Sequence, residues 1–156
     1  MAVFEMVDKI SSAIDGNDYS VGLFIDLSKA FDTRDHKILF NKLHHYGIRG
    51  MALDWFKSYF KNRTQYVDYN GFQSSKLDIK CGVSQGSILR LILFLIYIND
   101  IATVSDLRHL ILFADDTNIF MQHKNLLTLV TVVNAELQKL SNWFISNRLS
   151  INVKKT

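Results

Sequence analysis

Apolar residues recur along this chain with two different spacings, and each spacing predicts a type of element. Between Met1 and Ile14 they return every three or four positions, which predicts an amphipathic helix ended by residues 15–18. The short apolar run Tyr19–Ile25 predicts a strand, and Asp26 follows it directly. An acid at this point is expected at the end of a sheet, where open sites form.

Two helices are predicted in the next part of the chain. Asp32 or Thr33 is expected to cap the first helix, which runs to Tyr46 and ends at Gly47. The second helix carries the apolar and aromatic residues of the segment Leu53–Phe60.

The sequence then predicts a hairpin, a loop and a strongly apolar helix. The hairpin consists of strands Tyr66–Tyr69 and Leu77–Cys81 around a turn at Gly71. The segment Gly82–Ser87 is expected to form the loop. The run Leu91–Ile98 is too short to span a bilayer and predicts a buried helix.

The last part of the chain predicts a second hairpin, a long helix and a final strand, Leu149–Val153. In Ile111–Phe120, apolar residues lie on both sides of two adjacent aspartates, which predicts a strand, a tight turn and a strand. The long helix is expected to bury a stripe consisting of Leu126, Val130, Val133, Leu137, Leu140 and Phe144. Together these elements predict an α+β fold, an antiparallel sheet with helices packed on one face.

Composition and charge limit the size of the core, the type of partner and the cellular compartment that we expect. The chain has 156 residues, of which 48% are hydrophobic and 21% charged, enough for one domain with a sizeable core. Its net charge of +3 permits a polyanionic partner without requiring one. Cys81 is the only cysteine, which excludes a disulfide framework and a thiolate metal cluster. Because the first residues do not resemble a secretory signal, we expect an intracellular protein, in the nucleus or cytoplasm, that is not secreted.

The adjacent aspartates Asp115 and Asp116 are the clearest candidates for chemistry. Two neighbouring carboxylates repel each other, so a folded protein tolerates them best beside a cation. Mg²⁺ suits such a site, since it takes one or two carboxylates and fills its remaining positions with water and substrate phosphate. Taken alone, this segment is better explained by a solvated hairpin turn, and the rest of the chain favours the metal site.

Segments spread over nearly the whole chain resemble the sequence motifs of reverse transcriptases, in the family's order. Residues 24–32 (FIDLSKAFD) resemble motif A, 85–87 (QGS) motif B, 113–116 (FADD) motif C and 147–156 (NRLSINVKKT) motif D. Motif C and the sequences that flank the motifs are similar to those of non-LTR retrotransposon enzymes of the Jockey type. The resemblance implies a polymerase palm and an RNA-directed DNA polymerase activity.

This resemblance assigns a role to three aspartates. Polymerisation is an in-line phosphoryl transfer, in which positioning and charge neutralisation supply most of the catalysis. Two Mg²⁺ ions about 4 Å apart can clamp the attacking 3′-oxygen and the leaving oxygen, and Mn²⁺ is a possible substitute. Asp26 and Asp115 correspond to the family's bridging ligands, and Asp116 to the supporting third ligand.

The resemblance also implies contacts with the substrate. Leu27, Phe31, Gln85 and Gly86 correspond to substrate-binding positions. The ring of Phe31 would exclude a ribose 2′-OH, which favours dNTPs and argues against an RNA-dependent RNA polymerase or a nucleotide cyclase. The Gln85-Gly86 pair lets backbone approach the nucleotide closely. Lys155 corresponds to the motif D lysine thought to protonate the leaving pyrophosphate.

The domain and its partners follow from the same resemblance. We expect residues 1–156 to form a partial reverse transcriptase palm domain, with the family's fingers and thumb missing. The implied partners are an RNA template, a DNA primer and dNTPs, without a membrane. The chain is expected to belong to a larger polypeptide with fingers, thumb and endonuclease regions.

Three positions depart from the family's pattern and support a second interpretation. Ser84 replaces a usual proline, and Arg90 and Leu91 replace a usual Gly-Pro pair. A buried, unpaired guanidinium at Arg90 would destabilise the fold. Single-base changes typical of cytosine deamination account for all three. The alternative is therefore a catalytically inert palm remnant of a decayed element, which folds or binds nucleic acid without polymerisation.

Overall fold

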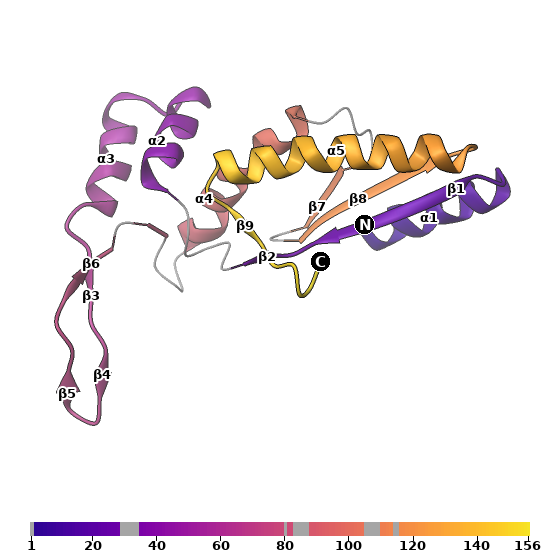
Figure 1. Ribbon diagram of the computed structural model, residues 1–156. Helices are drawn as coiled ribbons and strands as arrows, with labels where there is room; N and C mark the ends of the chain where they lie inside the picture. The colour runs from indigo at the N-terminus through magenta and orange to yellow at the C-terminus, as the bar shows by residue number, and fades with distance from the viewer. Residues whose placement is uncertain (1, 29–34, 80, 83–87, 105–109, 114–115) are drawn as a thin grey trace. The chain divides into compact units, whose positions relative to one another are not determined.

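The computed structural model describes all residues except 1, 29–34, 80, 83–87, 105–109 and 114–115. The chain divides into two compact units, the first made of Met1–Ala30 and Asn99–Thr156 and the second of Phe31–Ile98. Helices and antiparallel strands occur in both units, which confirms the α+β class (Figure 1).

The first unit contains a three-stranded antiparallel sheet with the order β1-β8-β7. Strand β1 is Tyr19–Ile25, as the sequence predicted, because strand-forming residues there are bounded by turn residues. Strands β7 (Leu110–Phe113) and β8 (Asp116–His123) confirm the predicted hairpin, with Phe113 opposite Asp116. In Figure 1 these strands lie side by side.

Alternating residues of this sheet form its packed face. Ile25 pairs with Thr117 and Leu23 with Ile119, and apart from half-buried Leu23 these side chains are buried. Phe24, which points to the other face, is half-exposed, whereas Phe120 of β8 on that same face is buried. Helices α1 (Ala2–Asp15) and α5 (Leu126–Ser146) both contact β1 and β8. The sheet and these two helices make up the core of the first unit.

The buried face of α5 differs from the predicted stripe in its first half. Leu126 and Val130 are exposed to solvent, so the prediction that they are buried was wrong. The buried side chains are Leu129, Glu136, Leu140, Trp143 and Phe144. Glu136 is tolerated there because Lys139 Nζ lies 2.8 Å from its carboxylate. The apolar stripe therefore follows the core only toward the end of the helix.

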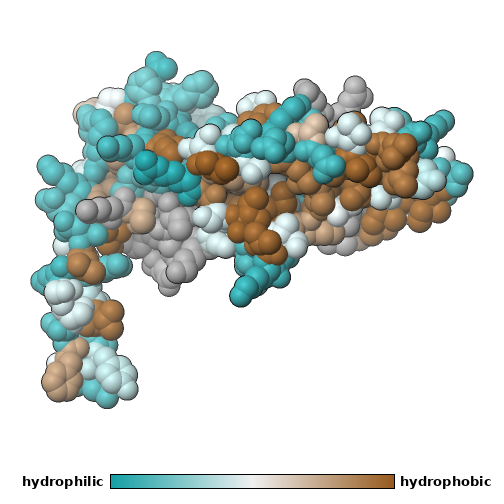
Figure 2. All heavy atoms as spheres, viewed as in Figure 1, coloured by the Kyte–Doolittle hydropathy of each residue, from teal (hydrophilic) through white to brown (hydrophobic). Residues whose placement is uncertain are grey.

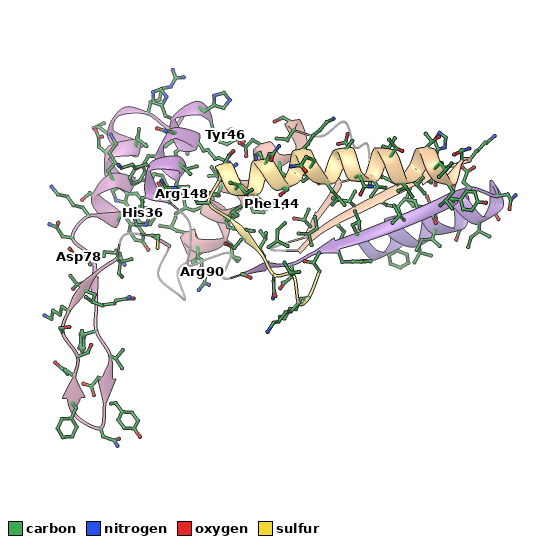
Figure 3. All side chains as sticks on the ribbon, in the orientation of Figure 1. His36, Tyr46, Asp78, Arg90, Phe144 and Arg148 are labelled. Carbon is green, nitrogen blue, oxygen red and sulfur yellow. The ribbon has the colours of Figure 1, made fainter. Side chains whose placement is uncertain are left out.

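The end of α5 turns the chain back toward β1. The predicted strand Leu149–Val153 is shorter in the structure, since β9 is Ser150–Ile151. It pairs antiparallel with β2 (Leu27–Ser28), and Figure 1 shows β9 beside β2. Figure 3 labels Phe144 in the last turn of α5 and Arg148 just beyond it. This return places the last residues of the chain next to the segment that follows β1.

The second unit begins with helix α2 (His36–His45). Its N-cap is Asp35, whose carboxylate accepts hydrogen bonds from the backbone N–H groups of Lys37 and Ile38. The prediction of Asp32 or Thr33 as the cap was therefore wrong, because Asp35 already satisfies the free N–H groups of the first turn. Gly47 ends the helix as predicted, with a positive φ of 89°.

Helices α3 (Gly50–Phe60) and α4 (Ile88–Ile98) pack near α2, and both contain buried residues. Lys42 of α2 donates from Nζ to the carbonyl of Tyr97 at 2.5 Å. His36 Nε2 lies 2.8 Å from the carbonyl oxygen of Gly82, which ties the start of α2 to the segment before α4. These contacts join helices that are distant in sequence.

A long hairpin follows α3. It is built from four short strands, β3 (Thr64–Gln65), β4 (Asp68–Tyr69), β5 (Phe72–Gln73) and β6 (Leu77–Asp78). The sequence predicted two longer strands, and the pairing is instead interrupted between β3/β6 and β4/β5. The predicted turn at Gly71 is confirmed, with positive φ at both Asn70 and Gly71, as a tight hairpin turn requires.

Helix α4 is only partly buried. Its inner face includes Leu93, Phe94 and Tyr97, whereas Leu91 is 57% exposed, so the prediction of a buried helix was half wrong. Arg90, labelled in Figure 3, is half-buried and not free of partners, which contradicts the expected buried, unpaired guanidinium. A short 3₁₀ helix, η1 (Asn99–Thr103), follows. None of the helices in the described part of the chain is long and apolar enough to cross a bilayer.

Candidate active site

The sheet of the first unit brings Asp26 and Asp116 to one end. Ile25 pairs with Thr117, and these are the immediate neighbours of Asp26 and Asp116 in the chain. Asp116 also pairs with Phe113, so the chain between β7 and β8 connects at this same end. The antiparallel register thus brings residues of motif A and motif C to the same end of the sheet.

Asp26 is held firmly by the residues around it. Its neighbours Ile25 and Leu27 are 3% and 5% exposed, which fixes the backbone on both sides. The half-buried carboxylate of Asp26 accepts a hydrogen bond of 2.7 Å from Nδ2 of Asn152 to its Oδ2. The backbone N–H of Asn152 also donates to the carbonyl of Asp26 at 2.8 Å. The residue that follows β9 is therefore bonded to Asp26 through both its backbone and its side chain.

The residues after β9 form a turn that begins at Asn152. The N–H groups of Lys155 and Thr156 donate to the carbonyl of Asn152 at 2.9 and 3.0 Å. The hydroxyl of Thr156 accepts a longer hydrogen bond, 3.4 Å, from the backbone N–H of Asp26. Lys155 is exposed on this turn. The motif D lysine thus belongs to a segment that is bonded directly to Asp26.

Sequence reasoning missed Asn152 and Thr156 as parts of this site. Both lie in the motif D segment, but only the pairing of β9 with β2 shows that they contact Asp26. The one available signal was an amide residue at the end of a predicted strand. A local pattern does not identify the partner of such a residue.

Four of the predicted site residues lie outside the described residues, namely Phe31, Gln85, Gly86 and Asp115. Asp116 is described through its backbone only. The side chain of Leu27 is buried, so a nucleotide would meet this residue through its backbone. Within the described ranges no group of three His, Cys, Asp or Glu side chains is placed to hold a metal ion.

The residues at this end of the sheet suit a hard divalent cation. Carboxylate oxygens are the ligands that Mg²⁺ and Mn²⁺ prefer. Oδ2 of Asp26 accepts a hydrogen bond from the side chain of Asn152, and no described residue donates to Oδ1. The carboxylate lies beside the end of the sheet at which Asp116 starts β8.

Comparison with known proteins agrees with this arrangement. The sequence profile described as "Reverse transcriptase (RNA-dependent DNA polymerase)" matches residues 4–156. The chain belongs to the reverse transcriptase family. This confirms the resemblance drawn from the motifs, and it covers both the strand that precedes Asp26 and the turn that carries Lys155.

Two relatives come from mobile elements of Drosophila melanogaster. The RNA-directed DNA polymerase from mobile element jockey is 28% identical over 150 residues, which is 92% of this chain and 16% of that protein. The probable RNA-directed DNA polymerase from transposon X-element is 30% identical over 95 residues, which is 61% of this chain and 10% of that protein. The likeness to Jockey-type reverse transcriptases is confirmed, and the chain spans less than a fifth of either relative.

Proposed function

We propose that this chain is the palm of an RNA-directed DNA polymerase from a non-LTR retrotransposon. It would add dNTPs to a primer 3′-OH under the direction of an RNA template. The observation that carries the proposal is the register of β1 with β8, which sets Asp26 at the end of the sheet where Asp116 begins β8. Membership of the reverse transcriptase family supports the choice of reaction.

The metal ligands in this proposal are Asp26, Asp115 and Asp116. When bound there, two Mg²⁺ ions, or Mn²⁺ in their place, supply neutralisation of the phosphate charge and a lower pKa for the attacking hydroxyl. The protein's own contribution is placement. The buried residues on each side of Asp26 and the hydrogen bond from Asn152 hold its carboxylate at the sheet end.

Nucleotide selection and proton transfer are assigned to neighbouring segments. Phe31 would lie under the sugar and exclude the 2′-OH, while the backbone of Gln85 and Gly86 would approach the base and template. Lys155 would donate a proton to the leaving pyrophosphate. Its position on a turn bonded to Asp26 supports that role, since the lysine and the metal ligand belong to one hydrogen-bonded segment.

The partners in this proposal are the template, the primer and the remainder of a longer polypeptide. The chain matches only 16% of the jockey polymerase, which leaves most of that protein to supply further contacts. Some apolar side chains of the first unit are exposed, including Phe4, Ile14 and Phe24. Their exposure supports contacts with other parts of a longer polypeptide. Figure 2 shows hydrophobic residues gathered on the visible surface of α1 and β1.

An inert remnant remains the second candidate, and Arg90 bears on it. The argument for decay assumed that this arginine would be buried without a partner, but it is half-buried and has one. Its neighbour Leu91 is more than half exposed. The Arg90-Leu91 pair is therefore compatible with a stable α4. Of the three departures from the family's pattern, this leaves Ser84, which lies outside the described residues, in support of inactivity.

Primer extension separates these two candidates. The full chain is incubated with a DNA primer on an RNA template, dNTPs and Mg²⁺ or Mn²⁺. Asp115→Asn is the test variant, and Asp8→Asn is the matched control because Asp8 is an exposed aspartate on α1. We expect at most weak extension by the wild type, the same extent of extension by D8N, and none by D115N. A folded wild-type chain that extends no primer would favour the inert remnant.

A further inference from the structure

We propose that Asn152 is a positioning residue that sets the orientation of the Asp26 carboxylate for metal binding. The inference rests on the proposed function, because it assumes that Asp26 is a metal ligand. It goes further in assigning a role to a residue just after the last strand, 126 positions away in the chain.

The contact has the geometry of a strong hydrogen bond. The distance from Nδ2 of Asn152 to Oδ2 of Asp26 is 2.7 Å, short for an amide donor, as expected when the acceptor carries a charge. An Asn amide donates only through its nitrogen, so the carboxylate fixes the orientation of the amide group. The bond is half-buried, which reduces competition from water.

The contact is directed at one oxygen of the carboxylate. Among the described residues, Oδ2 is the atom that accepts from Asn152, and Oδ1 accepts no hydrogen bond. The bond therefore limits rotation of the carboxylate without using Oδ1, and we assign that atom to the cation. Because the amide is neutral, it orients Asp26 without reducing the negative charge that attracts the metal.

The backbone of Asn152 forms its own hydrogen bonds, and a side-chain substitution leaves these bonds intact. Its N–H donates to the carbonyl of Asp26, and its own carbonyl accepts from Lys155 and Thr156. Replacing the side chain with leucine, which has nearly the same shape, keeps these backbone bonds and removes only the donor to Oδ2. The effect of the side chain can thus be measured apart from the effect of the turn.

The experiment measures Mn²⁺ binding to the full chain by electron paramagnetic resonance of the free ion. Asp26→Asn defines how much binding depends on the proposed ligand. For Asn152→Leu we expect the dissociation constant of that Asp26-dependent site to rise about tenfold or more, as for other groups that orient metal ligands. Asn152→Gln, which keeps an amide donor, should recover part of the loss.

The matched control is Val153→Ala, since Val153 is the next residue, lies in the same turn and is 82% exposed. It should bind Mn²⁺ as the wild type does. If N152L fails to fold, Asn152→Ser, whose hydroxyl is too short to reach Oδ2, is measured in its place.

Two outcomes overturn the inference, and they are distinguishable. Equal affinity in the wild type and the folded N152L variant, with loss in D26N, removes the role of Asn152 and leaves the proposed function standing. Absence of Asp26-dependent binding in the wild type removes the metal site of the proposed function, and the inference with it.

Discussion

The backbone N–H of Leu149 donates to the carbonyl of Phe144 at 2.9 Å, closing the end of α5. Both side chains are buried, as is common at helix ends of this type. Between them Arg148 has a φ of +53°, in the left-handed region that glycine favours. This turn reverses the chain into β9 and thereby delivers Asn152 and Lys155 to Asp26.

Replacing Arg148 with glycine should stabilise the protein, because the left-handed conformation costs a residue with a Cβ roughly 1–2 kcal/mol. We expect the free energy of unfolding in urea to rise by about 1 kcal/mol, since glycine also gives the unfolded chain more freedom. Gly47 offers the reverse test, since it occupies the same type of turn after α2 with nothing within 4 Å of an added Cβ. Gly47→Ala should lower the free energy of unfolding by a similar amount. A destabilised R148G would show that the arginine side chain outweighs its backbone strain.

The N-cap of α2 can be tested at Asp35. Its Oδ1 accepts from the N–H groups of Lys37 and Ile38 at 2.8 and 3.2 Å. Asp35→Ala should lower the free energy of unfolding by about 1 kcal/mol. Asp54→Ala is the control, because Asp54 forms an exposed ion pair with Lys57 on α3 and should cost less than about 0.5 kcal/mol. Equal losses in the two variants would argue against the cap.

The inner face of α5 predicts a contrast between two leucines of one helix. Leu140 is 1% exposed, and Leu140→Ala should cost about 2–5 kcal/mol because it leaves a cavity. Leu127 is 78% exposed, and Leu127→Ala should cost less than about 0.5 kcal/mol. Both are measured by urea unfolding. Similar losses of unfolding free energy in the two variants would mean that the buried face of α5 is assigned wrongly.

Phe31 carries the proposed selection against ribonucleotides. Phe31→Ala should raise incorporation of rNTPs relative to dNTPs by about tenfold, which corresponds to about 1.4 kcal/mol of discrimination. The ratio is measured in primer extension with each nucleotide supplied separately. Phe24→Ala is the control, since Phe24 is a half-exposed phenylalanine of β1. An unchanged ratio in F31A would assign Phe31 to packing.

The sequence predicted those elements whose side-chain period is strong and local. Strand Tyr19–Ile25 was placed residue for residue, and the aspartate hairpin followed from apolar runs on both sides of a polar turn. The predicted burial was wrong in the first half of α5, because exposed leucines and valines there continue the apolar spacing of the buried residues. Glu136 is buried through its contact with Lys139, and hydrophobic spacing carries no signal of such a pair.

Motif resemblance predicts the acids of the candidate site, Asp26, Asp115 and Asp116, because the family's chemistry depends on those residue types in that order. Their role as metal ligands stays a prediction, whereas the residues that hold Asp26 were not predicted. The contact from Asn152 to Asp26 joins residues 126 positions apart. It depends on the pairing of β2 with β9, each only two residues long, and so short a pairing leaves no periodic pattern in the sequence.

The most direct test of the account is the location of Mn²⁺ in crystals of the chain soaked with this ion, seen by its anomalous scattering. The account predicts Mn²⁺ at the end of the sheet, bound by the carboxylates of Asp26 and Asp115, and its loss in crystals of Asp26→Asn. Mn²⁺ bound elsewhere, or a sheet end that stays empty at saturating Mn²⁺, would contradict it.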